Sequence, residues 1–218
     1  MKKIAFILIA MGALLALSGI SFGQAPPAKA QLPVLTTSAG QSNDANTVNA
    51  VLEEAGIKYD YCDVPSLEMI NAGVGLGGKL SSESGFHAES YTDMAKFPKG
   101  SPYKAIIIAI GASLKGMGAS GLTTDAEEAR VKKIIDLCKK NKIYIIGVHA
   151  GGEAARGPAG SDNERMIDAV APLADCLIIT KDSNKDGRFS KIAEKSKAPL
   201  TQVDYALGMV EVLKKIFS

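Results

Sequence analysis

Short apolar runs alternate with amphipathic segments from residue 33 to the end of the chain. The runs are rich in branched aliphatic residues and predict buried strands at 33–38, 57–64, 105–110, 142–148 and 176–180. Between them, apolar residues recur at intervals of three and four positions, as Val48, Val51, Leu52 and Ala55 do, which predicts helices. Strands and helices that alternate with short joins predict a parallel sheet with right-handed crossovers.

Five such strands, with helices on both faces, predict a doubly wound α/β domain. The expected architecture is a flavodoxin-like, three-layer αβα sandwich around a five-stranded parallel sheet in the order 2-1-3-4-5. Weak alternation in 57–64 is typical of an edge strand.

Helix boundaries come from capping patterns. Thr124–Glu127 and Ser161–Glu164 both have the spacing of a capping box at the start of a helix. A short helix is expected at about Ser190–Lys195. The apolar stripe Val203, Leu207, Val210, Leu213 and Phe217 predicts one closing helix.

Residues 65–102 interrupt the alternation of strands and helices. This stretch is rich in Gly and Ser and predicts only short helices, at Ser66–Asn71 and about Thr92–Lys96. Connections of this length inside a compact domain are usually functional or irregular. Two interpretations remain open, a lid over a site and a surface excursion.

The first residues have the layout of a secretory signal peptide. Lys2 and Lys3 precede an apolar run that is too short for a comfortable membrane span, and small residues follow it. Cleavage fits after Ala25 or after Ala30, and we favour Ala30 because the other cut leaves Pro26 at the new terminus. The expected domains are therefore 1–30, a signal peptide and processing region, and 31–218, a single α/β domain. We expect an exported protein, periplasmic or extracellular, without a lipid anchor, because Ile20 stands where a lipidated Cys is needed.

Composition and charge narrow the function classes. The chain has 218 residues, 46% hydrophobic and 22% charged, as ordinary globular domains do. The formal charge of +2 falls to 0 when Lys2 and Lys3 are removed, and to −1 when Lys29 is removed too. A nearly neutral protein has no electrostatic basis for binding nucleic acid or anionic membranes.

Three cysteines, Cys62, Cys138 and Cys176, lie in the domain. Without a C-x-x-C pair they do not form a redox or metal motif. They are expected to be buried thiols, with a Cys138–Cys176 disulfide as the alternative.

Two glycine-containing motifs resemble known binding loops only in their letters. Gly116–Gly121 matches G-x-G-x-x-G, but it begins too far from the preceding strand to bind a dinucleotide, so we expect a flexible loop around Lys115 that directs N–H groups at an anion. Asp182–Gly187 begins like a calcium loop, but Ala193 stands where that loop needs Glu, so we expect a tight turn. We expect no cofactor and no metal.

Polar residues follow the ends of the predicted strands. Because the carboxyl ends of parallel strands meet at one edge of the sheet, they should lie together. Hydroxyls, amides, cations and a helix amino end favour a carboxylate, phosphate or sulfate ligand. The candidate ligand-binding residues are Ser38, Gln41, Ser42, Ser113, Lys115, His149, Gly151, Gly152, Glu153, Arg156 and Lys181.

His149 is also the candidate catalytic residue, because it stands where a strand becomes a loop. A histidine that only hydrogen-bonds neighbouring loops is the alternative. Glu153 is expected to orient Arg156.

The segments SLKGMGASG and HAGGEAARG resemble motifs of a family of exported bacterial α/β proteins classed as a domain of unknown function. The resemblance extends from Pro33 to about Leu200, and one departure is Ala155, where the family pattern favours a second Arg. It implies export and an α/β fold, and no chemistry. The motif positions are Ser113, Lys115, His149, Gly151, Gly152, Glu153 and Arg156.

Three functions follow as hypotheses. The first is an exported binding protein for a small anionic ligand at the carboxyl edge of the sheet. The second is a hydrolase or transferase with His149 as general base. The third is an envelope protein that acts through protein contacts, without pocket chemistry. The sequence leaves the oligomeric state open.

Overall fold

The computed structural model describes residues 29–80 and 86–218. The predicted signal peptide therefore lies almost wholly outside the described residues. Within them, no helix combines the length and the hydropathy that crossing a bilayer requires.

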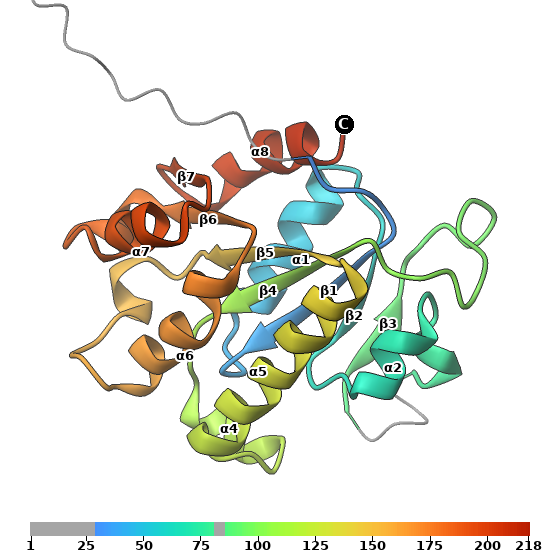
Figure 1. Ribbon diagram of the computed structural model, residues 1–218, viewed down its shortest axis with the longest axis horizontal. Coiled ribbons are helices and arrows are strands. Elements are labelled where there is room, and N and C mark those ends of the chain that lie inside the picture. The colour runs from blue at the N-terminus through green and yellow to red at the C-terminus, as the bar shows by residue number, and fades with distance from the viewer. Residues whose placement is uncertain (1–28, 81–85) are drawn as a thin grey trace, which may run out of the picture.

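Within the described ranges one seven-stranded sheet forms the middle layer, in the order β3-β2-β1-β4-β5-β6-β7 (Figure 1). All neighbouring strands pair in parallel except β3, which pairs antiparallel with β2. The strands are β1 (Val34–Ala39), β2 (Tyr59–Cys62), β3 (Ala88–Ser90), β4 (Ala105–Ile110), β5 (Tyr144–His149), β6 (Cys176–Thr180) and β7 (Leu200–Val203).

The five predicted strands are present in the predicted order, as β2-β1-β4-β5-β6, but the prediction of five strands is wrong. β3 comes from the irregular stretch, and its three residues are too few to show alternation. β7 lies where the apolar stripe predicts the start of the closing helix. Both strands extend the sheet at its edges, so β2 is not an edge strand.

Helices cover both faces of the sheet. In Figure 1, α5 crosses in front of the strands, whereas α1 lies behind them. The same division separates two apolar clusters, one containing Ile134 of α5 and Ile167 of α6, the other Leu52 of α1 and Leu213 of α8. The α-helices are α1 (Asp44–Glu54), α2 (Leu67–Ala72), α4 (Leu114–Ala119), α5 (Thr124–Asn141), α6 (Asp162–Val170), α7 (Arg188–Ser196) and α8 (Met209–Ile216). The 3₁₀ turns are η1 (Leu76–Gly78), η2 (Gly152–Ala155), η3 (Ala171–Leu173), η4 (Lys181–Asn184) and η5 (Ala206–Gly208).

Two local predictions need correction, and for the cysteines the prediction of buried thiols is confirmed over its alternative. The closing helix begins only at Met209, because Val203 belongs to β7 and Leu207 to an exposed 3₁₀ turn. Residues 92–96 form bends and turns rather than a helix. Cys138 and Cys176 form no disulfide; both thiols, like that of Cys62, are free and buried.

Ala30 contacts the folded domain. Its side chain is buried, and its N–H donates to the carbonyl of Ile216 at 2.9 Å. Cleavage after Ala30 would remove this contact, whereas cleavage after Ala25 would keep it.

The irregular stretch is fastened to the sheet by one buried carboxylate, Asp60 of β2. Its Oδ1 accepts from the hydroxyls of Ser90 and Thr92, both at 2.6 Å. Its Oδ2 accepts from the N–H of Gly75 at 2.7 Å and the hydroxyl of Tyr103 at 2.5 Å. Four donors from three separate segments of the chain therefore converge on one fully buried side chain.

We expect Asp60→Ala to lower the free energy of unfolding by about 3 kcal/mol or more, because it leaves several buried donors without an acceptor. Urea denaturation followed by circular dichroism measures this change. Asp93→Ala, which removes an exposed carboxylate in the same stretch, is the control. Equal stability of the two variants would show that Asp60 does not anchor the stretch.

Candidate functional site

The loops after β1 and β4 meet where crossovers leave the sheet in opposite directions, the usual place for a ligand in this architecture. Here the loops pack directly on each other. Gln41 and Ala112 form an isolated bridge, and a Cβ atom on Gly40 would lie 2.4 Å from the carbonyl oxygen of Gly111. The crevice between these two loops is therefore filled by backbone.

The Gly116–Gly121 motif is not a flexible loop. Its first residues lie in α4, whose amino end is capped by the Ser113 hydroxyl accepting from the N–H of Gly116 at 3.1 Å. A Cβ atom on Gly116 would lie 2.1 Å from the carbonyl oxygen of Gln41. This glycine allows α4 to pack closely against the loop after β1.

Glu127 has a different role from the predicted capping box. Thr123, not Thr124, caps α5, and the Glu127 carboxylate is fully buried against the loop after β1. It accepts from Arg130 at 2.7 Å, from the N–H of Gly40 at 2.8 Å and from the amide of Gln41 at 3.2 Å. Burial disfavours its charge, but Arg130 and these donors outweigh burial and lower the pKa of Glu127.

Arg156 is enclosed by acceptors of the protein itself. Its guanidinium donates to Glu164 at 2.6 Å and to Asp186 at 2.8 Å, and to the carbonyl of Ser183. The prediction that Glu153 orients Arg156 is wrong, because Glu153 pairs with Lys185 at 2.6 Å on the surface. The Arg156 charge is therefore already neutralised.

The other two candidate cations differ from each other. Lys181 pairs with Asp204 at 2.7 Å on the exposed surface. For Lys115, by contrast, the described part of the chain offers no carboxylate within salt-bridge distance. Lys115 is exposed on the first turn of α4.

His149 has no exposed surface. Its Nε2 lies 3.2 Å from the carbonyl oxygen of Ala155, which only accepts, so Nε2 carries the proton. Its Nδ1 then accepts from the hydroxyl of Ser183 at 2.7 Å. Burial lowers the pKa of His149 to about 4, and both ring nitrogens are occupied. The side chain therefore joins two loops and does not face a ligand.

The two candidate glycines pack against carboxylates. A Cβ atom on Gly151 would lie 3.0 Å from Oδ1 of Asp44, and one on Gly152, where φ is 64°, would lie 2.9 Å from Oδ2 of Asp182. Asp44 also accepts from the Ser42 hydroxyl at 3.1 Å, and burial raises its pKa. Sequence reasoning missed Asp44, because an acidic residue in the first turn of a helix is already explained by its interaction with the helix dipole.

Two adjoining hollows lie beside α4 at the carboxyl edge. We name the first, of about 250 Å³, the β1 pocket; it is lined by Ser38, Gln41, Ser42, Asn43, Asn46, Tyr61, Asp63, His87, Gly116, Ala119 and Ser120. The second, of about 450 Å³, is the Lys115 hollow, lined by Gln41, Asn43, Ser113, Lys115, Gly116 and Ala119. Four lining residues are common to both, so the two hollows adjoin each other.

The structure thus divides the predicted site. Five candidates line these hollows: Ser38, Gln41, Ser42, Ser113 and Lys115. The other six line neither hollow and lie at the end of β5 or in the loops after β5 and β6: His149, Gly151, Gly152, Glu153, Arg156 and Lys181. Sequence reasoning missed Asp63, although it follows β2 as Gln41 follows β1. It also missed His87, because no pattern links residues before β3 to this edge.

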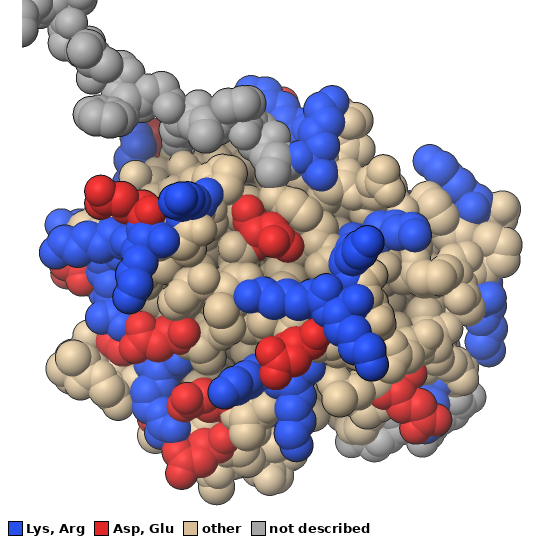
Figure 2. Space-filling view, viewed as in Figure 1, with Lys and Arg blue, Asp and Glu red and all other residues tan. Residues whose placement is uncertain are grey.

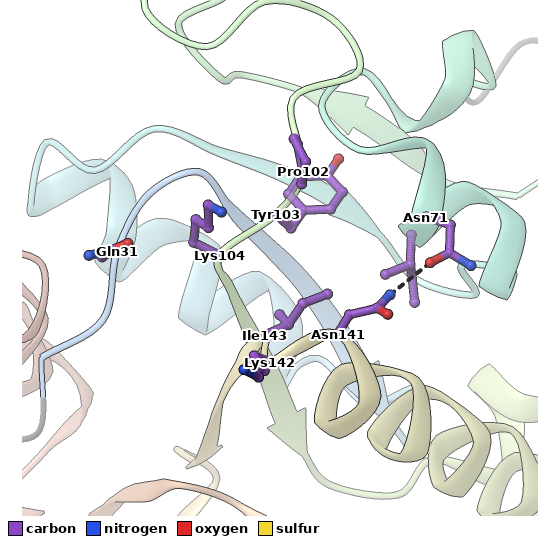
Figure 3. A pocket seen from close by; sticks show the side chains of 9 residues that line it. Gln31, Asn71, Pro102, Tyr103, Lys104, Asn141, Lys142 and Ile143 are labelled. Atoms are coloured by element: carbon purple, nitrogen blue, oxygen red, sulfur yellow. Dashed lines mark hydrogen bonds between the residues drawn. The ribbon is translucent and has the colours of Figure 1, made fainter.

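A larger cavity, of about 470 Å³, lies at the opposite edge of the sheet, where β4 and β5 begin (Figure 3). Asn71 and Asn141 on its wall bind each other at 2.9 Å. Lys104 and Lys142 are on its exposed rim. The amides that line it thus satisfy each other in part, and none of the predicted site residues reaches it.

Lys and Arg side chains are interspersed with Asp and Glu side chains over the face in Figure 2. Within the described residues, no group of three or more His, Cys, Asp or Glu side chains is arranged to hold a metal ion. Asp186, in the turn that begins like a calcium loop, binds Arg156 instead.

Comparison with known proteins gives a family and weak fold neighbours. The family model DUF6305, a domain of unknown function, matches residues 31–217, which confirms the resemblance to a family without established activity. No curated protein matches the chain. A GDSL-like lipase from Bacteroides thetaiotaomicron is 12% identical over 78% of this chain and 66% of its own, with a TM-score of 0.30. A protein from Bacteroides fragilis described as an acylhydrolase is 13% identical over 83% and 72%, with a TM-score of 0.31. The chain thus spans just under two thirds of the lipase, and likeness at this level carries no inference about activity.

His149 makes stability depend on pH. Its pKa is lowered in the fold, so the unfolded chain gains a proton first as pH falls, and stability present above pH 6.5 is lost towards pH 4. We expect the free energy of unfolding to fall by about 2 kcal/mol from this residue between pH 7 and pH 5. Urea denaturation of His149→Gln should show that much less pH dependence than the parent protein does. The same pH dependence in His149→Gln would contradict the assignment.

Arg156 is expected to stabilise the folded protein. Arg156→Ala leaves the buried Glu164 carboxylate with Arg188 and the N–H of Gly157 as its partners, and should lower the free energy of unfolding by about 2–3 kcal/mol. Lys185→Ala breaks only exposed pairs and should cost at most about 1 kcal/mol. Thermal and urea denaturation compare the two; equal losses would mean that the Arg156 network is no stronger than a surface pair.

Proposed function

The chain belongs to the DUF6305 family, a domain of unknown function, and we propose that it is an exported protein that binds a small anionic ligand in the Lys115 hollow. The periplasm or the extracellular space is the proposed location, from the layout of the first residues. The ligand class is a carboxylate, phosphate or sulfate.

One observation carries the proposal. Lys115 is a cation without a carboxylate partner among the described residues, and it lines a hollow at the carboxyl edge of a parallel sheet. The candidate cations Arg156 and Lys181 are paired with carboxylates of the protein. An anion from outside would give Lys115 the partner that the fold does not provide.

The amino end of α1 supports the same ligand class. Asn43, which lines both hollows, precedes this eleven-residue helix and provides no side-chain cap. The N–H groups of Ala45 and Asn46 lie in the first turn of the helix, where N–H groups have no intrahelical carbonyl as acceptor. The carboxylate of Asp44 lies instead beside Gly111 and Gly151. Free N–H groups and the positive end of the helix dipole favour an anion.

The hydrolase or transferase hypothesis has less support from the geometry. A general base must reach the proton that it removes, directly or through one water. His149 is fully buried, and both of its ring nitrogens are bonded to the protein.

A protein-contact function is the second candidate. Arg156 does not join Lys115 at a common ligand site, and Leu114, next to Lys115, is 70% exposed. Tyr205 and Leu207 are similarly exposed, although they lie elsewhere in the chain. These residues are the ones to replace when a partner rather than a ligand is sought.

A thermal-shift screen of the protein from Gln31 against carboxylates, phosphates and sulfate tests the ligand. At a hundred times its dissociation constant, a ligand adds about 2.7 kcal/mol of stability, equivalent to several degrees. Lys115→Ala should abolish the shift. Lys181→Ala, which removes an exposed lysine already paired with Asp204, is the matched control and should keep it.

Two results would contradict the anion site. One is the absence of a thermal shift with every anion, which would favour the protein-contact function instead. The other is a shift that Lys115→Ala leaves unchanged, which would place the ligand elsewhere on the protein.

A further inference from the structure

We propose that the ligand carries hydroxyl groups next to its anionic group, and that these hydroxyls bind in the β1 pocket while the anion binds Lys115. This inference rests on the proposed function and adds the chemical class of the ligand. The class is that of hydroxylated anions, such as sugar acids and sugar phosphates.

The first observation is a buried hydroxyl without a partner. Ser38 is 2% exposed and lines the β1 pocket, yet the described residues supply no hydrogen-bond partner for its Oγ. Buried polar side chains are nearly always hydrogen-bonded, and an exception needs an explanation. A ligand or a water in the pocket would provide the missing bond.

Strand alternation directs this hydroxyl to the α1 face of the sheet. Thr36, two residues earlier in β1, points to the same face and binds Asn49 of α1 at 2.8 Å. Ala109, the register partner of Ser38, belongs to the apolar cluster on that face. Ser38 therefore faces α1, and Asn46 in the first turn of that helix lines the same pocket.

The lining of the β1 pocket differs from that of the Lys115 hollow. It contains no Lys or Arg, but it has hydroxyl, amide and imidazole groups together with the Asp63 carboxylate. One oxygen of Asp63 accepts from the N–H of Val64, at 2.8 Å, and the backbone N–H of His87 also stabilises this carboxylate. This mixture of donors and acceptors suits hydroxyl groups, each of which both donates and accepts. A second anionic group would instead be repelled by Asp63.

The two hollows adjoin along a shared wall, which is where one ligand could contact both. Gln41, Asn43, Gly116 and Ala119 line each of them. The Gln41 side chain is held between the two, because its amide nitrogen donates to Glu127 and to the carbonyl of Asp63. A ligand that extends along Gln41 would place its anionic end at Lys115 and its hydroxyls at Ser38 and Asp63.

Ser38→Ala and Asp63→Asn are suitable test variants because neither should disturb the fold. Ser38 Oγ makes no bond to lose, so its removal should leave the melting temperature unchanged. The asparagine oxygen can still accept from the N–H of Val64. Thr36→Val, which breaks the bond to Asn49, is the contrasting control and should lower the melting temperature without affecting binding.

The test is isothermal titration calorimetry with two matched pairs of probes. D-gluconate and hexanoate share a six-carbon carboxylate and differ in hydroxyls, as D-glucose 6-phosphate and inorganic phosphate differ in the sugar. We expect the hydroxylated member of at least one pair to bind at least about tenfold more tightly. Ser38→Ala and Asp63→Asn should each weaken the binding of the hydroxylated member about tenfold. They should leave the affinity for the member without hydroxyls unchanged. Lys115→Ala should weaken both members.

The outcomes separate the two proposals. Equal affinity within both pairs, with loss in Lys115→Ala, would overturn the hydroxyl inference and leave the anion site standing. Hydroxyl-dependent binding that Lys115→Ala does not change, with D-glucose as effective as D-gluconate, would overturn the anion site. No binding of any probe would overturn both.

Discussion

The buried carboxylate of Glu127 holds the loop after β1, and both hollows depend on that loop. With Arg130 it forms an ion pair that accepts from Gly40 and Gln41, while Arg130 also donates to the carbonyl of Ser38. Helix α5 is thereby joined to the end of the first strand through several directional bonds. A buried ion pair adds little net stability over an apolar contact of the same shape. Its effect here is positional, because it sets where Gln41 and Ser38 lie.

The two halves of the carboxyl edge differ in how completely their charged side chains pair with each other. Over β5 and β6, Arg156, Arg188, Glu164 and Asp186 satisfy each other, and His149 is closed in beside them. In that half of the edge, the ion pairs hold the loops after β5 and β6 together. Over β1 and β2 the polar groups are less completely paired, as Ser38 and Lys115 show. The polar groups without a protein partner, such as Ser38 Oγ and Lys115, therefore lie in the half with fewer charges.

The irregular stretch contributes to this half. Asp60 collects donors from Gly75, Ser90, Thr92 and Tyr103, which holds the described part of the stretch against β2. β3 then pairs with β2, and the carbonyl of His87 accepts from the N–H of Asp63 at 3.0 Å. The described part of the stretch thus extends the sheet and supplies one wall of the β1 pocket.

The sequence by itself determined the layers, the five central strands and their order, because apolar periodicity is local and short crossovers allow few topologies. It also located the carboxyl edge and five residues of its hollows. Tertiary structure alone decided which charged side chains pair with each other. HAGGEAARG predicted an anion site, yet Glu164 and Asp186, from other elements, neutralise Arg156. Glu127 had the spacing of a capping residue, but contacts with Gly40 and Gln41 gave it another role. Such pairings join residues far apart in the chain, so a sequence pattern gives the residue types at the edge and not which of their charges remain free.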